Sequence, residues 1–110
     1  MTTVSVKDEY IEILTALGDV QAAIDLAVQC YAISQITAKV AELKKNEAKY
    51  RAKYGIDYPT FAQRIGQDEA WIEKIEADGN KLWEIDLADW EFCYKGIEDW
   101  TIKLQTILTM

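Results

Sequence analysis

The stretch Leu82-Trp83-Glu84-Ile85-Asp86-Leu87-Ala88-Asp89-Trp90-Glu91-Phe92-Cys93-Tyr94 decides how the second half of the chain folds. Along it and beyond it, apolar residues recur in alternating steps of 4 and 3. This is the stripe that a helix presents when it packs one face against another helix. We therefore expect a long helix from Lys81 to about Leu108. The stripe consists of Trp83, Leu87, Trp90, Tyr94, Ile97, Thr101, Leu104 and Leu108.

A similar stripe runs through the first half, from Val6 to Ile24, and keeps its phase across Gly18. It predicts one long helix that is capped by Ser5 and ends at Gly55, with a bend at Gly18. The alternative is a break, in which Gly18 ends one helix and Asp19 caps the next.

Two short helices are expected between the long ones. The first is capped by Asp57 and stopped by Gly66, and the second runs from about Asp68 to Ala77. The turn Asp78-Gly79-Asn80 follows. The predicted fold is all-α, with two long antiparallel helices joined by short helices in a single domain, residues 1–110.

The segment from residue 20 to residue 36 is apolar on more than one side of its helix. Such a helix needs more than one neighbour, so we expect a homodimer, assembled as a helical bundle. A buried core helix or a membrane-proximal helix is the competing interpretation, and polar interruptions such as Asp25 argue against a membrane span. The predicted oligomer interface comprises Val20, Ile24, Val28, Tyr31 and Ile36.

The chain is acidic, with a net charge of −7 and a pI near 4.5. Residues 56–110 carry 12 acids and 5 bases, whereas residues 1–55 carry 7 of each. Nucleic acids and anionic membranes attract basic surfaces, so neither is expected as a partner. A basic protein is the partner that this charge favours.

Six of the seven basic residues of the first half lie between Lys39 and Lys53. Three interpretations are open: a solvated helix end where cations suit the helix dipole, a contact with the acidic second half, and a weak nucleic-acid footprint. The overall charge disfavours the last of these.

Cys30 and Cys93 stand among apolar neighbours and are expected to be small buried hydrophobic residues, with a disulfide as the alternative. The N-terminal residues lack the basic region and apolar core of a signal peptide. A cytoplasmic location is therefore expected.

The chain has no histidine, which removes the commonest general base and a common metal ligand. It also lacks a glycine-rich phosphate loop. We therefore predict no enzymatic activity, cofactor or metal. The carboxylates of Glu84, Asp86, Asp89 and Glu91 leave a magnesium-dependent or acid–base enzyme as a minor alternative. Asp86 lies between two tryptophans, so it needs a cationic or hydrogen-bonding partner, which the basic cluster could supply.

Trp83, Trp90 and Trp100 belong either to the core or to an interface. As an interface, aromatic rings interleaved with acids would suit arginines of a partner. The predicted partner-binding residues are Trp83, Asp86, Asp89, Trp90, Glu91 and Trp100.

Two segments together resemble a known family. Lys53-Tyr54-Gly55-Ile56-Asp57-Tyr58-Pro59-Thr60-Phe61, followed by Trp83-Glu84-Ile85-Asp86-Leu87-Ala88-Asp89-Trp90-Glu91, is similar to a family of small helical proteins of cyanobacteria and archaea. The members are regarded as antitoxin-like partners in type II toxin–antitoxin pairs. The resemblance covers residues 50–95 and implies neutralisation of a basic toxin. The alternative function is a structural homo-oligomeric coiled-coil or adaptor protein.

Overall fold

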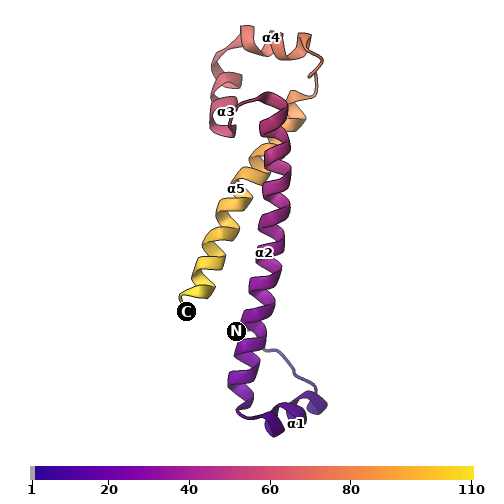
Figure 1. Cartoon of the computed structure of the whole chain (residues 1–110), viewed down its shortest axis with the longest axis vertical. Coiled ribbons are helices and arrows are strands. Elements are labelled where there is room, and N and C mark those ends of the chain that lie inside the picture. The colour runs from indigo at the N-terminus through magenta and orange to yellow at the C-terminus, as the bar shows by residue number, and fades with distance from the viewer. Residues whose placement is uncertain (1) are drawn as a thin grey trace. The chain divides into compact units, whose positions relative to one another are not determined.

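Residues 2–110 are described by the structure, a computed structural model, and every regular element in this range is a helix. The all-α prediction is therefore confirmed for these residues. Within them, no helix combines the length and the apolar run that crossing a bilayer requires. The helices are α1 (Asp8–Leu17), α2 (Val20–Tyr54), α3 (Tyr58–Gln67), α4 (Glu69–Ala77) and α5 (Trp83–Leu108) (Figure 1).

The chain divides into two compact units at a boundary inside α2. The first unit extends to Gln35 and contains α1 and the beginning of α2. The second runs from Ile36 to Met110 and contains the rest of α2 with α3, α4 and α5. A single domain over residues 1–110 stays a prediction.

The helix break at Gly18 corrects the expectation of one continuous helix. Gly18 has a φ of 148°, a backbone conformation that favours glycine. Its N–H donates to the carbonyl oxygen of Leu14, and Asp19 then accepts a hydrogen bond of 2.8 Å from the Ala22 N–H. Asp19 therefore caps α2, and the helix that follows is a new one.

The start of α1 also differs from the prediction. Lys7, not Ser5, precedes the first helical residue, and no side chain caps this end. Asp8 and Glu9 occupy the first turn, where their charges suit the positive end of the helix dipole.

The two short helices begin and end close to the predicted positions. The Asp57 side chain accepts a hydrogen bond of 2.9 Å from the Thr60 N–H, and caps α3. The Asp68 side chain likewise accepts one of 3.0 Å from the Trp71 N–H, and caps α4. Gly79, with a φ of 94°, forms the predicted turn into α5. These local predictions are confirmed.

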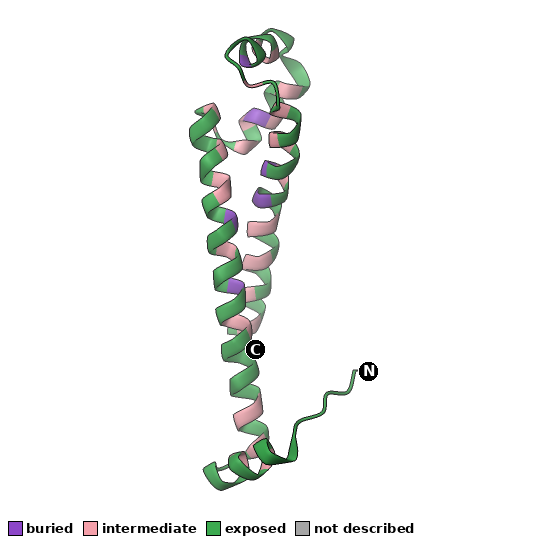
Figure 2. Ribbon diagram, turned by 90° about the vertical axis from the view of Figure 1, so that its right-hand side faces the viewer, coloured by how far each residue is buried: buried purple, intermediate pink, exposed green. Residues whose placement is uncertain are grey.

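The core of the second unit is small and aromatic. Phe61, Ile75 and Trp90 are buried, with exposed fractions of 0%, 6% and 0%. They come from α3, α4 and α5, so the short helices are held to α5 by this cluster. Where α2 and α5 lie side by side, their facing sides carry buried and half-buried residues (Figure 2). The half-buried residues that pack against the cluster of Phe61, Ile75 and Trp90 are Tyr50, Tyr54, Ile56, Tyr58, Ile65, Trp71, Trp83 and Leu87.

Side chains connect α2 and α5 in a regular order within this unit. The Lys39 ammonium lies 5.2 Å from the Trp100 ring centroid, and the Tyr54 hydroxyl donates to Asp86. Between these ends, Leu43 packs against Gly96, where an added Cβ would lie 3.0 Å from Leu43 Cδ1. Residues that come later in α2 therefore contact residues that come earlier in α5.

Candidate functional site

Trp90 lies in an aromatic cage. Its ring centroid is 5.8 Å from that of Tyr50, 5.9 Å from Tyr54, 5.8 Å from Tyr58 and 5.0 Å from Phe61. Such pairs contribute about 0.5–1.5 kcal/mol each beyond the area they bury. The indole N–H points towards a Glu47 carboxylate oxygen at 3.4 Å. The structure therefore places this residue in the core of the unit.

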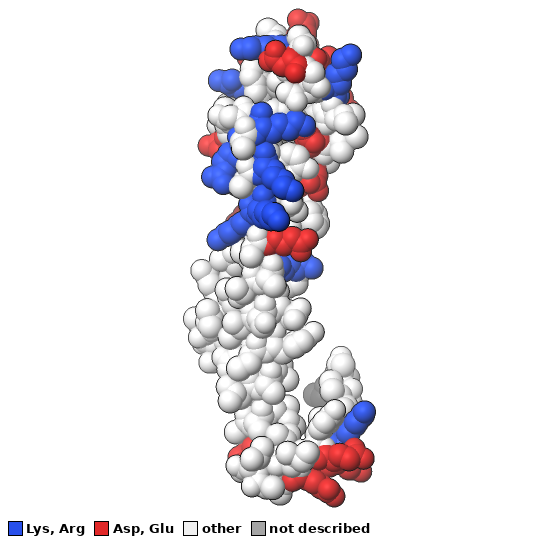
Figure 3. Space-filling view, turned by 45° about the vertical axis from the view of Figure 1, so that its right-hand side comes forward, with Lys and Arg blue, Asp and Glu red and all other residues white. Residues whose placement is uncertain are grey.

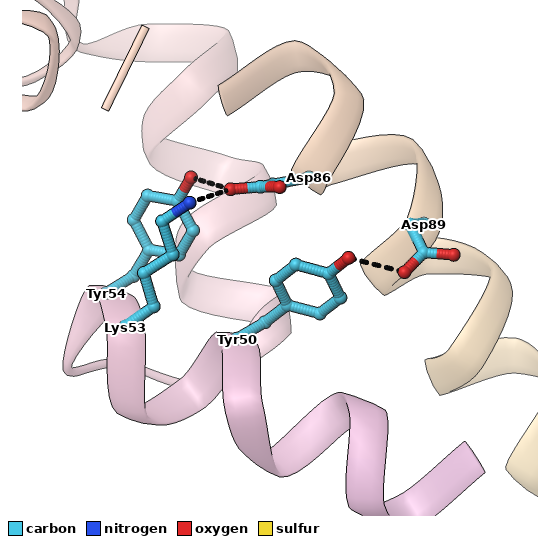
Figure 4. A network of polar contacts seen from close by, with 5 residues as sticks. All are labelled: Tyr50, Lys53, Tyr54, Asp86 and Asp89. Atoms are coloured by element: carbon cyan, nitrogen blue, oxygen red, sulfur yellow. Dashed lines mark hydrogen bonds and ion pairs between the residues drawn. The ribbon is translucent and has the colours of Figure 1, made fainter. Parts of the chain in front are cut away.

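Asp86 and Asp89 face α2 and hold two of the tyrosines of the cage (Figure 4). The Tyr54 hydroxyl donates to Asp86 Oδ2 at 2.5 Å, and Lys53 Nζ donates to the same oxygen at 2.6 Å. The Tyr50 hydroxyl donates to Asp89. The side chain of Asp86 is only 13% exposed, so the predicted need for a cationic partner from the basic cluster is confirmed.

The carboxylates shift the titration of both phenols. The hydrogen bond to Asp89, followed by burial, raises the pKa of Tyr50 well above its usual value. For Tyr54, burial is the larger cause and the hydrogen bond to Asp86 the second, and its pKa is raised as well. Ionising either phenol would place a second negative charge beside a carboxylate. Both side chains therefore stay protonated donors through the neutral range.

Trp83 and Trp100, the other two tryptophans among the predicted partner-binding residues, are half-buried. Trp83 donates its indole N–H to Glu76 at 2.9 Å. Trp100 has Lys39 and Lys103 over its ring, at 5.2 Å and 5.1 Å from the centroid. Trp83 thus packs against the cluster that contains Trp90. Trp100 lies about three helical turns beyond Trp90 on α5 and outside this cluster.

Glu91, the last of the predicted partner-binding residues, is paired within its own helix. Lys95 Nζ lies 2.6 Å from Glu91 Oε1, and the side chains are 66% and 44% exposed. An ion pair exposed to this degree contributes little to stability. Glu91 therefore remains accessible from solvent.

The basic cluster is divided among several contacts. Lys53 reaches Asp86, which confirms a contact with the acidic second half. Arg51 pairs with Glu47 at 3.2 Å, and Lys39 lies over Trp100.

The predicted oligomer interface contains exposed, half-buried and buried residues. Val28 and Tyr31 are 62% and 69% exposed, and Val20 and Ile24 are half-buried. Ile36 is buried, with 6% exposed, and belongs to the second unit. Between residues 20 and 38, Asp25 is the only charged residue. The uncharged surface of this stretch is visible in Figure 3.

The cysteines have different surroundings. Cys93 is buried, with 1% exposed, and burial raises the pKa of its thiol. Cys30 is exposed, so the expectation that both are buried is wrong for this residue. Its apolar neighbours in the sequence lie on a helix segment that the described chain leaves uncovered. Neither cysteine forms a disulfide.

Sequence reasoning did not single out Tyr50 and Tyr54 as partners of the two aspartates. Their signal was present, because both tyrosines stand on the apolar stripe at the end of α2, one turn apart. Within residues 2–110, no group of three or more Cys, Asp or Glu side chains is arranged to hold a metal ion. The hydrogen bonds of Asp86 and Asp89 join α5 to the end of α2.

Comparison with protein-family models, with curated proteins and with solved structures returned no significant match. The resemblance to antitoxin-like proteins therefore stays a prediction.

Proposed function

We propose that the chain is a non-enzymatic protein-binding module. It dimerises through the stretch from residue 20 to residue 36 and presents the acidic surface of its second half to a basic protein. Neutralisation of a basic toxin, as in a type II toxin–antitoxin pair, is the most concrete form of this function.

The uncovered apolar surface of the first unit carries the proposal. No described residue of this unit is buried, although Leu26, Val28 and Tyr31 are large and 60–69% exposed. Contiguous apolar surface on a protein marks a place of association. Burying one Leu or Val side chain fully contributes on the order of 1.5–3 kcal/mol, so a few such side chains support a dimer.

The arrangement of the two long helices is part of the same proposal. We place the end of α2 and α5 antiparallel, because their contacts run from Lys39 with Trp100 to Tyr54 with Asp86. In the dimer, two such pairs would form a helical bundle.

The surface for a basic partner lies on the accessible acids of α5. Glu91 and Glu84 are available there, whereas Asp86 and Asp89 are already hydrogen-bonded within the chain. Trp100 offers a half-buried aromatic face near Lys103. Trp90 is fully buried beneath this surface and does not form part of it.

A structural homo-oligomer is the second candidate. The complete burial of Trp90 favours it, because an apolar stripe that only forms the core of its own protein needs no external partner. The two candidates differ in the accessibility of Trp83 and Trp100 in the isolated oligomer. Iodide quenching of single-tryptophan variants distinguishes them: protected rings favour the structural protein, and accessible rings beside free carboxylates favour the binding module.

The test of toxin neutralisation is genetic and biochemical. We expect the adjacent gene to encode a small basic protein whose toxicity is relieved when this chain is co-expressed. The variant Glu84→Lys/Glu91→Lys should lose this relief, whereas Glu69→Lys/Glu73→Lys, with the same change of charge on α4, should keep it. A neighbouring gene product without toxicity, or relief by both variants, would count against the acidic surface of α5.

A further inference from the structure

A second stripe with the spacing of a coiled coil runs along the outside of α5. Its steps are 3, 4, 3, 4, 3 and 4, and every member is exposed in the single chain. Ile85, Phe92 and Ile102 are 64%, 67% and 54% exposed, so the described chain leaves the large apolar members of this stripe uncovered. The stripe consists of Ile85, Ala88, Phe92, Lys95, Asp99, Ile102 and Thr106.

This outer stripe is complementary to itself when two copies run in opposite directions. With its centre between Lys95 and Asp99, each Lys95 meets Asp99 of the second copy. On either side of these two ion pairs, Phe92 meets Ile102 of the second copy. Ala88 and Thr106 form the next layer, where both side chains are small.

The same stripe is not complementary to itself in the parallel direction. Two parallel copies in register would place Lys95 beside Lys95 and Asp99 beside Asp99 of the second copy. Like charges in a helix–helix interface disfavour a pairing, and a polar residue at such a position selects register and orientation. The charges on the stripe therefore select one alignment.

A groove runs along one side of the outer stripe. It has a volume of about 450 Å³ and is lined by the outer-stripe residues Ala88, Phe92, Lys95 and Asp99. Gly96 also lines it and has no side chain, so the groove reaches down to Leu43 of α2.

Lys95 already has a partner in the single chain, Glu91 at 2.6 Å. Both side chains are largely exposed, so little is lost when Lys95 turns from Glu91 to Asp99 of the second copy. Asp99 has no ion pair or side-chain hydrogen bond among the described residues.

We infer that α5 is a second self-association surface, which packs antiparallel against α5 of another copy through the outer stripe. This surface is separate from the stretch between residues 20 and 36, and neither depends on the other. It adjoins Glu91 and Trp100, so a second copy and the proposed basic partner would compete for this face of α5. Two self-complementary surfaces on one chain produce either a closed tetramer or an open filament.

The test is a charge exchange followed by sedimentation equilibrium of the full chain. Lys95→Glu and Asp99→Lys each place like charges in both contacts between position 95 of one copy and position 99 of the second. Each variant should therefore have at most half of the wild-type mass. The double variant Lys95→Glu/Asp99→Lys restores two opposite-charge pairs and should recover the wild-type mass. An equimolar mixture of the two single variants should recover it as well.

The matched controls are Lys81→Glu and Glu73→Lys, which make the same changes of net charge at exposed positions outside the outer stripe. They should keep the wild-type mass, and circular dichroism should show the same helix content for every variant. The inference is overturned if both single variants keep the wild-type mass. It is equally overturned if neither the double variant nor the mixture recovers the mass.

Discussion

Lys53 and Asp86 are 33 positions apart in the chain, yet the ammonium and carboxylate lie 2.6 Å from each other. The same carboxylate oxygen accepts from the Tyr54 hydroxyl (Figure 4). Because one residue of α5 takes two donors from the last turn of α2, this contact fixes how the two helices meet at the aromatic core.

Replacing Asp86 tests this contact. Asp86→Ala removes the acceptor and leaves the half-buried Tyr54 hydroxyl without a partner, which should lower the free energy of unfolding by about 1–3 kcal/mol. Tyr54→Phe removes only one donor and should lower it by about 1 kcal/mol. Urea unfolding followed by circular dichroism measures both. Tyr10→Phe is the control, since Tyr10 is 56% exposed. An Asp86→Ala protein as stable as the wild type would show that the contact does not hold the helices.

The burial of Trp90 predicts a large effect of truncation. Trp90→Ala should lower the free energy of unfolding by about 3–5 kcal/mol, because a cavity opens among the aromatic rings. Trp90→Phe keeps most of the contacts and should lose less. Trp100→Ala should have a smaller effect than Trp90→Ala, because Trp100 is half-buried and lies outside the cluster. Equal losses for Trp90→Ala and Trp100→Ala would contradict the placement of the core.

Alkaline pH should weaken the second unit through Tyr50 and Tyr54. Both have a pKa raised in the folded state, so their contribution is fully present below the ordinary tyrosine pKa of about 10. Above that pH the unfolded chain ionises first, and the contribution falls as pH rises towards the folded-state pKa. Urea midpoints measured across this range should fall less steeply for Tyr50→Phe/Tyr54→Phe than for the wild type. Parallel slopes would refute the role of the two phenols.

The cap of α3 predicts an acid dependence of the opposite sign. The hydrogen bonds to Thr60 lower the pKa of Asp57, so its contribution is present above the unfolded-state pKa and lost as pH falls through the folded one. Asp57→Ala should lower the melting temperature at neutral pH, whereas Asp57→Asn, which can still cap, should change it less. The difference between Asp57→Ala and wild type should shrink below about pH 4. A constant difference down to acid pH would show that the carboxylate is not the cap.

The sequence was most informative where structure depends on neighbours in the chain. Asp57 and Asp68 were recognisable as caps, and the turn at Gly79 followed from residue type, because each needs only hydrogen bonds a few residues away. The partner of Asp86 was also predictable, since a carboxylate between two tryptophans must be neutralised and the cations gather at the end of α2.

The sequence was least informative where several elements decide together. A stripe that keeps its phase across Gly18 reports which faces are apolar, but continuity of the helix is decided locally by Gly18 and Asp19. Cys30 and Cys93 have similar neighbours in the sequence, yet α2 and α5 bury only the second. Trp90 and Trp100 likewise differ because α3 covers one of them and not the other.

The mass of the chain in solution tests the central claim most directly. Sedimentation equilibrium at micromolar concentration should show at least a dimer. Val28→Glu/Tyr31→Glu places charges on the stretch between residues 20 and 36, and this variant should have at most half of the wild-type mass. The control is Lys44→Gln/Lys45→Gln, at two exposed sites on the same helix. It changes the net charge by the same amount and should keep the wild-type mass. A wild-type chain that stays monomeric, or a Val28→Glu/Tyr31→Glu variant with the wild-type mass, would contradict the proposal that residues 20–36 form the dimer interface.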